Sequence, residues 1–514
     1  MPFLWNFPLF TIILSLFSGV LCILLPWRAA KWYTVIYECI LIGLVSTVLW
    51  HTAQAGISFT YPMGEFPAPW GNEIRAGTLE ALMALGFLVV LLCSVLGGWT
   101  FLQIDVDESK LNLYFGLINL LTAALMALVW TNDVFTGYVF LEIMTLTSCG
   151  LLIARENGRT ALAAMRYMIM NLLGSGLFLL GIVLLYNLTG HLLMVPMREA
   201  VSSILTEDGA RPLTFALIIL TIGLGLKSGL FPFYFWMPDA YGSATPTSAA
   251  ILSALVSKSY IFLLFKIYYR AIGIAVLSTL PIPRILLILG ILGMIFGSIA
   301  AIRSRNINRM VAYSSAAQIG YIFLGIGLGG PLGYAAAIFQ ILCHAVTKSL
   351  LFLTTPQLAS VSGDSLLLEN LQGSGRRAKA AGLFFTLGAF SMVGIPFFAG
   401  FSAKLNFALA AAEHGPGEML GVLIALAIST ILNAIYYIGA VIRIYTAGRG
   451  GMELRAREIY AKEHGVVPEL PPEPQASNLY FRISAGILAV CNLLLALAPW
   501  AVLNLIAQGL STFS

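Results

Sequence analysis

Five charged side chains lie inside long apolar segments of this sequence, and their types suit them to carry protons. They are the glutamate Glu142 and the lysines Lys227, Lys258, Lys348 and Lys404. A charged side chain at the centre of a bilayer costs about 2.5–3.5 kcal/mol, so the five together carry a gross cost of roughly 12–17 kcal/mol. A Lys–Glu pair could join two helices, but one acid cannot pair with four bases. Because a desolvated lysine can exist uncharged, the series favours a proton path.

A histidine accompanies one of the buried lysines. His344 and Lys348 are spaced i, i+4 in C-H-A-V-T-K-S-L-L-F, which places them on one face of a helix. A lone histidine in a membrane helix is most often a packed, hydrogen-bonded residue, whereas one that lies a single turn from a lysine is better interpreted as a proton relay. Glu38, in the second apolar segment, is as consistent with a helix–helix hydrogen bond as with a functional role.

Two of these lysines lie close to a proline that interrupts its apolar segment. Pro232 follows Lys227, and Pro396 precedes Lys404. A proline inside a membrane helix removes a backbone donor and opens the preceding turn, where water or a side chain can enter. The two segments share a Gly–Pro–Phe core, since G-L-F-P-F in the first corresponds to G-I-P-F in the second. Interrupted helices at corresponding places in two halves are typical of transporters built from repeats.

The composition identifies the bilayer as the solvent for most of the chain. The 514 residues are 59% hydrophobic and only 10% charged, so the segments that carry the lysines must be membrane helices. The small net charge of +5 and the absence of a basic stripe argue against nucleic acid as a partner. The six cysteines are scattered singly, and no dinucleotide-binding, P-loop or haem motif is present. We therefore expect no cofactor, no metal and no catalytic chemistry on this chain.

About fourteen apolar runs are long enough to span a bilayer, at roughly 17–25 residues each. They lie near 4–26, 33–50, 79–102, 111–130, 134–153, 162–187, 213–236, 246–269, 284–302, 310–329, 332–355, 380–405, 417–445 and 480–508. The first has no basic residue before it, so we expect a retained helix and not a signal peptide. An even number of spans places both termini on the same side of the membrane.

Lysines and arginines in the loops predict the orientation. The odd-numbered loops and adjoining helix ends hold eighteen of the 28 basic residues. The even-numbered loops hold six, which are Arg75, Arg198, Arg211, Lys266, Arg270 and Arg284. Because cytoplasmic loops carry the basic excess, the odd loops are predicted to be cytoplasmic and both termini to face outward. We expect a multi-pass protein of the inner (plasma) membrane of a prokaryote.

Five ordered motifs resemble the antiporter-like subunits of complex I (NADH:quinone oxidoreductase). They are L-E-I-M-T-L-T-S, K-S-G-L-F-P-F-Y-F-W-M-P-D-A-Y-G-S-A-T-P-T-S, N-I-N-R-M-V-A-Y-S-S-A-A-Q-I-G-Y, H-A-V-T-K-S-L-L-F-L and G-I-P-F-F-A-G-F-S-A-K. The likeness covers roughly residues 105–445. It extends to the D-type subunit of Mrp cation/proton antiporters and to the membrane subunits of energy-converting hydrogenases.

The resemblance implies an all-α membrane fold of two inverted five-helix repeats, helices 4–8 and 9–13, with helices 7 and 12 broken. The implied units are helices 1–3 (1–104), the first repeat (105–270), the second repeat (271–445), a cytoplasmic amphipathic and proline-rich loop (446–479) and helix 14 (480–514). That loop is either a solvated connector or a docking surface for another subunit.

The resemblance also implies roles for the buried residues. Glu142 would be the charge-switching carboxylate, and Lys227 its partner. Lys258 would be the connecting lysine, His344 with Lys348 the relay, and Lys404 the terminal lysine. Three departures from the family pattern stand out: Tyr234 replaces a usual histidine, Asn306-Ile-Asn308-Arg309 replaces D-x-K-R, and the run L-F-L-T-T-P after Lys348 lacks a usual glycine. The lysine at 404, where glutamate also occurs, resembles the Mrp D-type and hydrogenase-associated members.

These patterns predict a proton-translocating subunit, or a cation/proton antiporter subunit, of a multi-subunit complex. Its expected partners are other membrane subunits, including homologous antiporter-like ones. The expected cargo is protons, with sodium as a second candidate. The alternative is a non-transporting scaffold that anchors a redox or hydrogenase partner. A carrier for an organic solute would need a polar or aromatic pocket at the broken helices, where the sequence instead places lysines.

Overall fold

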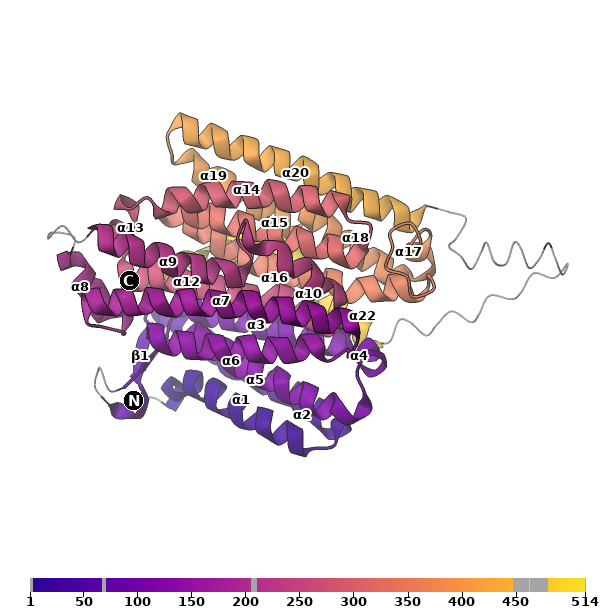
Figure 1. The fold of residues 1–514 in the computed structure, drawn as a ribbon, viewed down its shortest axis with the longest axis horizontal. Coiled ribbons are helices and arrows are strands. Elements are labelled where there is room, and N and C mark those ends of the chain that lie inside the picture. Colours follow the sequence, from indigo (N-terminus) through magenta and orange to yellow (C-terminus); the bar gives the residue numbers. More distant parts are fainter. Residues whose placement is uncertain (1–2, 67–70, 205–209, 447–461, 463–478, 514) are drawn as a thin grey trace.

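The computed structural model describes residues 3–66, 71–204, 210–446, 462 and 479–513. Within these ranges the chain is a bundle of long helices that run parallel to the long axis of the molecule (Figure 1). Thirteen helices in the described part of the chain are long and apolar enough to cross a membrane. The predicted all-α membrane fold is confirmed.

The first half of the bundle begins with four α-helices, three 3-10 turns and a short hairpin. These elements are η1 (Phe3–Asn6), α1 (Phe7–Leu24), α2 (Trp27–Ala55), β1 (Phe59–Pro62), η2 (Met63–Glu65), β2 (Glu73–Ala76), α3 (Thr78–Gly97), α4 (Trp99–Asp105) and η3 (Glu108–Lys110). The next are α5 (Leu111–Trp130), α6 (Val134–Ile153), α7 (Gly158–Thr189), α8 (Met194–Ile204), α9 (Ala210–Ser228), η4 (Phe233–Trp236), α10 (Met237–Ser243), α11 (Pro246–Ile251), η5 (Leu252–Val256), α12 (Ser257–Lys266) and η6 (Ile267–Ile272). The antiparallel pairing of β1 with β2, Phe59 opposite Ala76, lies in a segment whose sequence showed only a polar interruption.

The second half contains the remaining helices of the described residues. They are α13 (Ile274–Thr279), α14 (Ile282–Arg303), α15 (Ile307–Leu328), α16 (Gly330–Ser360), α17 (Ser374–Arg377), α18 (Lys379–Val393), α19 (Ala399–Ala412), α20 (Pro416–Tyr445), α22 (Leu479–Leu497) and α23 (Pro499–Ser511). The predicted twelfth span is present as two shorter helices, α18 and α19, which completes the fourteen predicted apolar segments. The predicted loop 446–479 lies almost entirely outside the described residues.

Both predicted helix breaks are present. The segment 210–243 stops being helical after Ser228, where Gly229 has a φ of 80°, and resumes at Phe233. The segment 379–412 is interrupted between Val393 and Ala399, where Gly394 has a φ of 87°. Pro232 and Pro396 both lie inside these interruptions, as expected for residues that cannot donate to a helix. The inverted relation of the two repeats and the domain boundaries stay predictions.

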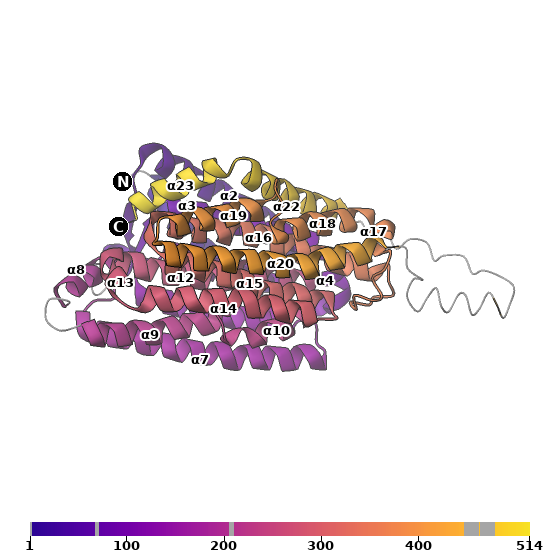
Figure 2. The same cartoon turned by 90° about the horizontal axis from the view of Figure 1, so that it is seen from above.

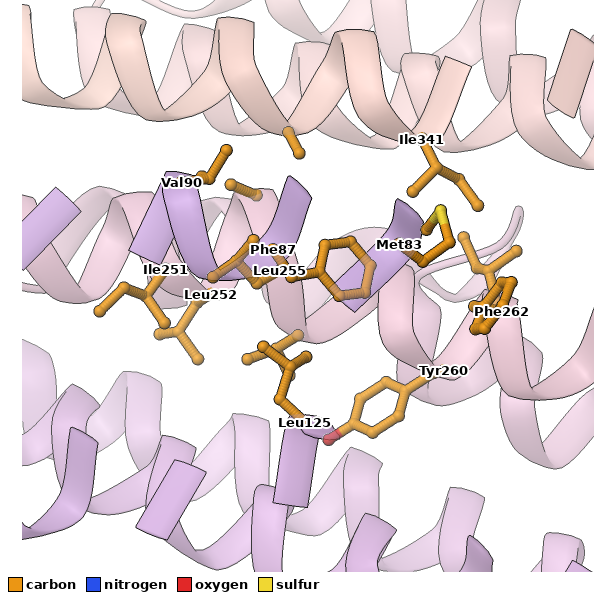
Figure 3. Packing of buried hydrophobic residues seen from close by; sticks show 14 of the residues in the cluster. Met83, Phe87, Val90, Leu125, Ile251, Leu252, Leu255, Tyr260, Phe262 and Ile341 are labelled. Carbon is orange, nitrogen blue, oxygen red and sulfur yellow. The ribbon is translucent and has the colours of Figure 1, made fainter. Parts of the chain in front are cut away.

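Two spans are surrounded by protein and form the centre of the bundle. The windows of Pro246–Ile272 and Gly330–Ser360 are wholly buried, whereas those of the outer helices bury about a third of their residues. Figure 3 shows apolar side chains of α3, α5, the Pro246–Ile272 span and α16 packed together, including Phe87, Leu125, Leu255 and Ile341. In Figure 2, α7 and α9 lie along one long side and α22 with α23 along the opposite side. The central spans carry Lys258, His344 and Lys348.

The two termini lie at the same end of the bundle, together with the hairpin and α8 (Figure 1). An even number of crossings requires this arrangement. We call it the terminal end. The opposite end, which we call the basic end, holds α4, α17 and the ends of α14 and α20.

Candidate proton-transfer site

The sequence-predicted pair of Glu142 and Lys227 forms between α6 and α9. Lys227 is fully buried, and its Nζ lies 3.4 Å from Oε1 of Glu142. Ser175 of α7 also donates to Oε1 of Glu142. Lys227 occupies the last turn of α9, just before the helix break, and Gly174 and Gly223 allow α7 and α9 to approach closely beside it. Helix α9 therefore ends one residue after Lys227.

Glu142 is the more accessible partner, since 27% of its side chain is exposed. It lies on the same stripe of α6 as the exposed apolar residues Phe135, Val139 and Leu146. The helix that carries it begins at the N-cap Asp133, whose side chain accepts a hydrogen bond from the backbone of Thr136. Burial raises the pKa of Asp133, against the opposing effect of that hydrogen bond. Glu142 can thus reach the lateral surface of the bundle while it contacts a buried lysine.

Two polar side chains lead from Lys227 toward the central spans. Nζ of Lys227 donates to Oγ1 of Thr145 at 2.8 Å, and Thr145 is hydrogen-bonded to the hydroxyl of Tyr260 at 3.4 Å. The ring of Tyr260 also faces the ammonium of Lys227, 5.5 Å from its centroid. Tyr260 lies two residues after Lys258 on α12. These contacts extend from the first pair to the central span that carries Lys258.

Lys258, His344 and Lys348 lie on the two central spans, and we call them the central basic group. All three are fully buried, and the charges of both lysines act on His344. Nζ of Lys258 donates to the carbonyl of Ser253 at 2.5 Å and to Oγ of Ser257 at 3.0 Å. Lys258 follows directly on η5, a π-helical turn, and such turns often occur at functional sites. Neither ring nitrogen of His344 has a hydrogen-bond partner among the described residues.

Lys348 extends the group toward α15 and α20. Its Nζ donates to the carbonyl of Val311 at 2.7 Å, to Oγ of Ser314 and to the hydroxyl of Tyr437 at 3.2 Å. Ser314 and Tyr437 are themselves hydrogen-bonded at 2.6 Å. These partners are neutral, so they can accept from either the charged or the uncharged amine.

Lys404 lies on α19, directly beyond the second helix break. Its Nζ donates to the carbonyl of Val393 at 2.6 Å and to Oγ1 of Thr430 at 2.9 Å. Val393 is the last residue of α18, whose final carbonyls have no partner within the helix. Asn492 of α22 accepts from the first backbone N–H of α19 at 3.3 Å and so helps to hold the break in place. The break supplies the lysine with a backbone acceptor.

A polar face of α20, which the sequence motifs do not indicate, connects Lys348 to Lys404. Thr430, Asn433 and Tyr437 are spaced i, i+3, i+7, so they share one face of the helix. Tyr437 accepts from Lys348, Thr430 accepts from Lys404, and Asn433 between them accepts from Ser298 at 3.1 Å. The spacing can be found in the sequence. Because the three side chains are neutral, however, their presence in an apolar segment does not by itself indicate a functional role.

For a second group of charges, the sequence correctly placed Arg75 between two spans and wrongly placed Lys266 and Arg270 in a loop, and it did not predict that these residues are buried. Arg75, Lys266 and Arg270 were counted as loop residues, but all three are buried with Glu80, and we call these four residues the terminal charge cluster. Nη1 of Arg75 lies 2.5 Å from Oε1 of Glu80, and Nη1 of Arg270 lies 3.9 Å from it. Lys266 donates to the carbonyls of Val129 and Thr131 at 2.7 and 2.5 Å. The helix that carries Lys266 and Arg270 continues to Ile272 inside the protein, so its end is not a loop.

The remaining sequence candidates lie away from the lysine series. Glu38 is fully buried and accepts a hydrogen bond from Thr122 of α5 at 2.8 Å. This agrees with the first of its two sequence-based interpretations, a helix–helix hydrogen bond. Tyr234 packs edge-on against Tyr313, with ring centroids 6.5 Å apart. Tyr234 and Asn306 both line a cavity of about 560 Å³ at the basic end.

The profile of the family described as "NADH:quinone oxidoreductase/Mrp antiporter, TM" matches residues 131–431, more than half of the chain. The chain belongs to this family. The N subunit of NADH-quinone oxidoreductase from Desulforudis audaxviator is 30% identical over 86% of this chain and 84% of its own length. The D-type subunit of the Na(+)/H(+) antiporter from Bacillus subtilis is 25% identical over 87% of this chain and 88% of its own length. The resemblance inferred from the five motifs is confirmed.

Solved structures share the fold across nearly the whole antiporter-family chain. A chain of the membrane-bound sulfane sulfur reductase, an archaeal respiratory membrane complex, has a TM-score of 0.84 at 26% identity, covering 98% of this chain and 97% of that chain. A chain of the Mrp complex from Dietzia has a TM-score of 0.86 at 23% identity, covering 100% and 98%. A chain of respiratory complex I from Thermus thermophilus has a TM-score of 0.73 at 24% identity, covering 98% and 100%. These neighbours are parts of multi-subunit membrane complexes.

Proposed function

We propose that this chain is a proton-translocating membrane subunit of a multi-subunit complex, and that protons move along the series Glu142, Lys227, Lys258, His344, Lys348 and Lys404. The observation that supports it best is the unequal pairing of the four lysines in this series. Among the described residues, Lys227 is the only one of the four within 4.0 Å of a carboxylate. The hydrogen-bond acceptors recorded there for Lys258, Lys348 and Lys404 are all neutral. Membership in the antiporter family supports the same function.

The geometry suggests how movement of one carboxylate would drive a proton. While Glu142 remains near Lys227, its negative charge favours the protonated amine. Two unit charges 4 Å apart interact by about 4 kcal/mol at an effective dielectric constant of 20. Displacement of Glu142 would remove most of this support, and the proton would pass by way of Thr145 and Tyr260 toward the central group. The neutral acceptors there tolerate both the loaded and the empty amine.

The position of Glu142 also suggests where the driving force enters. An ionisable group on a lipid-facing stripe is costly unless it has a partner, and Glu142 is partly exposed between Val139 and Leu146 on such a stripe. We infer that another membrane subunit covers this face and supplies a charge that attracts Glu142. The energy would come from that partner, either from a redox reaction or from a counter-cation gradient.

Replacement of Lys227 provides the direct test. Lys227→Leu removes the charge, whereas Lys227→Arg retains a charge that cannot be released at physiological pH. If Lys227 loads and unloads protons, both variants will lose coupled proton movement in everted vesicles that carry the native complex, measured with a pH-sensitive dye. Lys110→Leu, at an exposed lysine paired with Glu156, serves as the matched control and should retain wild-type transport. Normal transport by Lys227→Arg would reduce the residue to a structural counter-charge.

The same vesicles would identify the driving reaction. A pH gradient that sodium alone dissipates would establish an antiporter subunit. A gradient that builds only when a reductant is added would establish a redox-driven pump. No response to either would favour the scaffold interpretation over the proposed function.

We further propose that the basic end of the bundle is cytoplasmic and that both termini face outward in the inner membrane of a prokaryote. Two cysteine substitutions test this orientation, Ser109→Cys at the basic end and Ser202→Cys on α8 at the terminal end. Both serines are exposed. A membrane-impermeant maleimide should label position 109 in everted vesicles and position 202 in spheroplasts, above the background of the native cysteines. The opposite labelling pattern would reverse the orientation.

A further inference from the structure

Two adjoining cavities open at the basic end, where α7, α10, α14 and α15 meet. The smaller, of about 200 Å³, is lined by Arg159, Arg166, Asp239 and other residues. The larger, of about 560 Å³, is lined by Arg303, Arg305 and the aromatic residues described below. Asn306 and Arg309 belong to both cavities. No part of the proposed proton route passes through them.

The cavities have a marked excess of positive charge. Five arginines face one carboxylate, Asp239, which pairs with Arg166 at 2.5 Å and with Arg309 at 3.1 Å. Arg159, Arg303 and Arg305 have no ion-pair partner among the described residues. In addition, α15 starts at Ile307, and the start of this 22-residue helix carries the positive end of its dipole. The site therefore favours an anion with several acceptor oxygens.

The opposite wall of the larger cavity is apolar and continues onto the membrane-facing surface. Phe296 of α14 lines the cavity while 45% of it is exposed, and it stacks on Phe231 with ring centroids 5.3 Å apart. Other exposed residues of α14, such as Ile285 and Ile288, extend this apolar surface along the span. The arginines lie at the end of α14, a candidate membrane span that stops at Arg303. Positive charge at this end of α14 and apolar surface along its length match an amphipathic ligand.

We propose that these two cavities bind the phosphate headgroup of an anionic phospholipid, with its acyl chains along α14. Basic pockets between membrane helices on the cytoplasmic side suit such headgroups. The unpaired guanidinium groups of Arg303 and Arg305 would contact the phosphate oxygens, and the hydroxyl of Tyr234 can donate to them. An acidic protein segment would satisfy the arginines but would leave the apolar face of α14 without an occupant. The lipid would join α14 and α15 to η4, immediately after the helix break at Pro232.

The test compares lipids and paired arginine variants on the full-length chain. The purified protein is titrated in detergent with dioleoyl phosphatidylglycerol, with dioleoyl phosphatidylcholine or with inorganic phosphate, and bound lipid is counted by native mass spectrometry. Arg303→Gln with Arg305→Gln forms the test variant. Arg376→Gln with Arg443→Gln is the control, since these exposed arginines lie at the same end and line neither cavity. Both variants remove the same charge.

We expect phosphatidylglycerol to bind the wild type and the control with equal affinity and to bind the test variant about tenfold or more weakly, since each basic residue near a headgroup contributes on the order of 1 kcal/mol. The lipid should also raise the melting temperature of the wild type and the control more than that of the test variant. Equal binding by all three proteins, or equal affinity for phosphatidylcholine, would overturn the proposal. Inorganic phosphate that binds as tightly as the lipid would assign the site to free phosphate. Unchanged lipid binding with loss of a neighbouring subunit from the native complex would assign it to a protein contact.

Discussion

At the scale of single residues, the buried lysines differ in what holds them. Lys227 has a carboxylate within reach, but Lys258, Lys348 and Lys404 donate to backbone carbonyls and hydroxyls in the described structure. A carboxylate stabilises one protonation state of its partner, whereas a neutral oxygen discriminates less between the two. A lysine with neutral acceptors can therefore change its charge at a lower cost than one held in a salt bridge. In the proposed mechanism, this difference would separate a switching step at Glu142 from conduction through the later lysines.

His344 allows function and stability to be separated. Both of its ring nitrogens are buried without a hydrogen-bond partner in the described structure, which makes the side chain costly for packing. We expect His344→Leu to lower proton transport by about a hundredfold, the lower end of what a positioned proton-transfer group contributes. The same change should leave the melting temperature unchanged or raise it, because two unsatisfied polar atoms are removed.

Transport in vesicles and thermal unfolding of the purified protein would be measured on the same preparation. A variant that keeps the wild-type transport rate would remove His344 from the route. A variant that loses both stability and transport would show a packing role instead.

At the scale of elements, the interruptions in two helices supply what intact helices cannot. The break after α9 places Lys227 in a final turn, and the break after α18 leaves the carbonyl of Val393 free to accept from Lys404. An uninterrupted helix would use that carbonyl in its own hydrogen bonds. The π-helical turn of η5 similarly precedes Lys258, whose ammonium donates to the carbonyl of Ser253 within that turn. Local departures from helical geometry thus coincide with three of the four lysines.

Gly394 is the residue on which the second break depends. It has a φ of 87°, and a Cβ atom there would lie 2.9 Å from Cδ and 3.1 Å from Nζ of Lys404. We expect Gly394→Ala to cost about 1–3 kcal/mol of stability and to reduce transport by displacing the ammonium group from Val393. Thermal unfolding and vesicle transport provide the two measurements.

Gly439 offers the matched control, because a Cβ atom there meets nothing within 4 Å and the residue lies inside α20. Gly439→Ala should retain transport and gain up to about 1 kcal/mol from its better helix propensity. Equal behaviour of the two alanine variants would show that the break tolerates an ordinary backbone and does not position Lys404.

At the scale of the whole molecule, long-range contacts connect the N-terminal third to the centre and to the far end of the chain. The terminal charge cluster joins Arg75 and Glu80 to Lys266 and Arg270, and Arg75 also donates to the carbonyl of Thr512. The ring of Phe513 packs against the guanidinium groups of Arg75 and Arg270, at 5.2 and 5.6 Å. The carboxylate of Glu80 therefore pairs with two buried guanidinium groups at a junction between the hairpin, the central span and the C-terminal segment.

Removal of that carboxylate should destabilise the fold as a whole. Glu80→Gln removes the buried carboxylate that pairs with Arg75 and Arg270, and breaking a buried pair in this way costs about 3–5 kcal/mol. The melting temperature of the purified protein should fall by several degrees. Glu418→Gln, at a carboxylate that is 56% exposed and 3.9 Å from His414, should leave it within experimental error. A stable Glu80→Gln variant would mean that the cluster is not a structural junction.

Composition and local pattern were sufficient to predict the class of fold, the membrane spans, both broken helices and the lysine series. These features depend on properties that a single segment displays by itself, because an apolar run of sufficient length crosses a bilayer and an interior proline interrupts its own helix. The motifs also allowed the family to be identified, since their order and spacing along the chain are a property of the sequence. Lys227 and Glu142 could be paired from the family resemblance alone.

Only the tertiary structure decided which side chains from different segments lie next to each other. The sequence placed Arg75, Lys266 and Arg270 in loops, because a charge near the end of an apolar run has the same pattern whether water or protein surrounds it. The hydrogen bonds that Thr145, Tyr260 and the polar face of α20 make with the lysines and with one another were not predicted, because neutral hydroxyl and amide groups acquire such partners only when side chains from distant segments pack against them. Hydrophobic burial selects the spans one at a time, whereas packing between spans decides which polar groups meet.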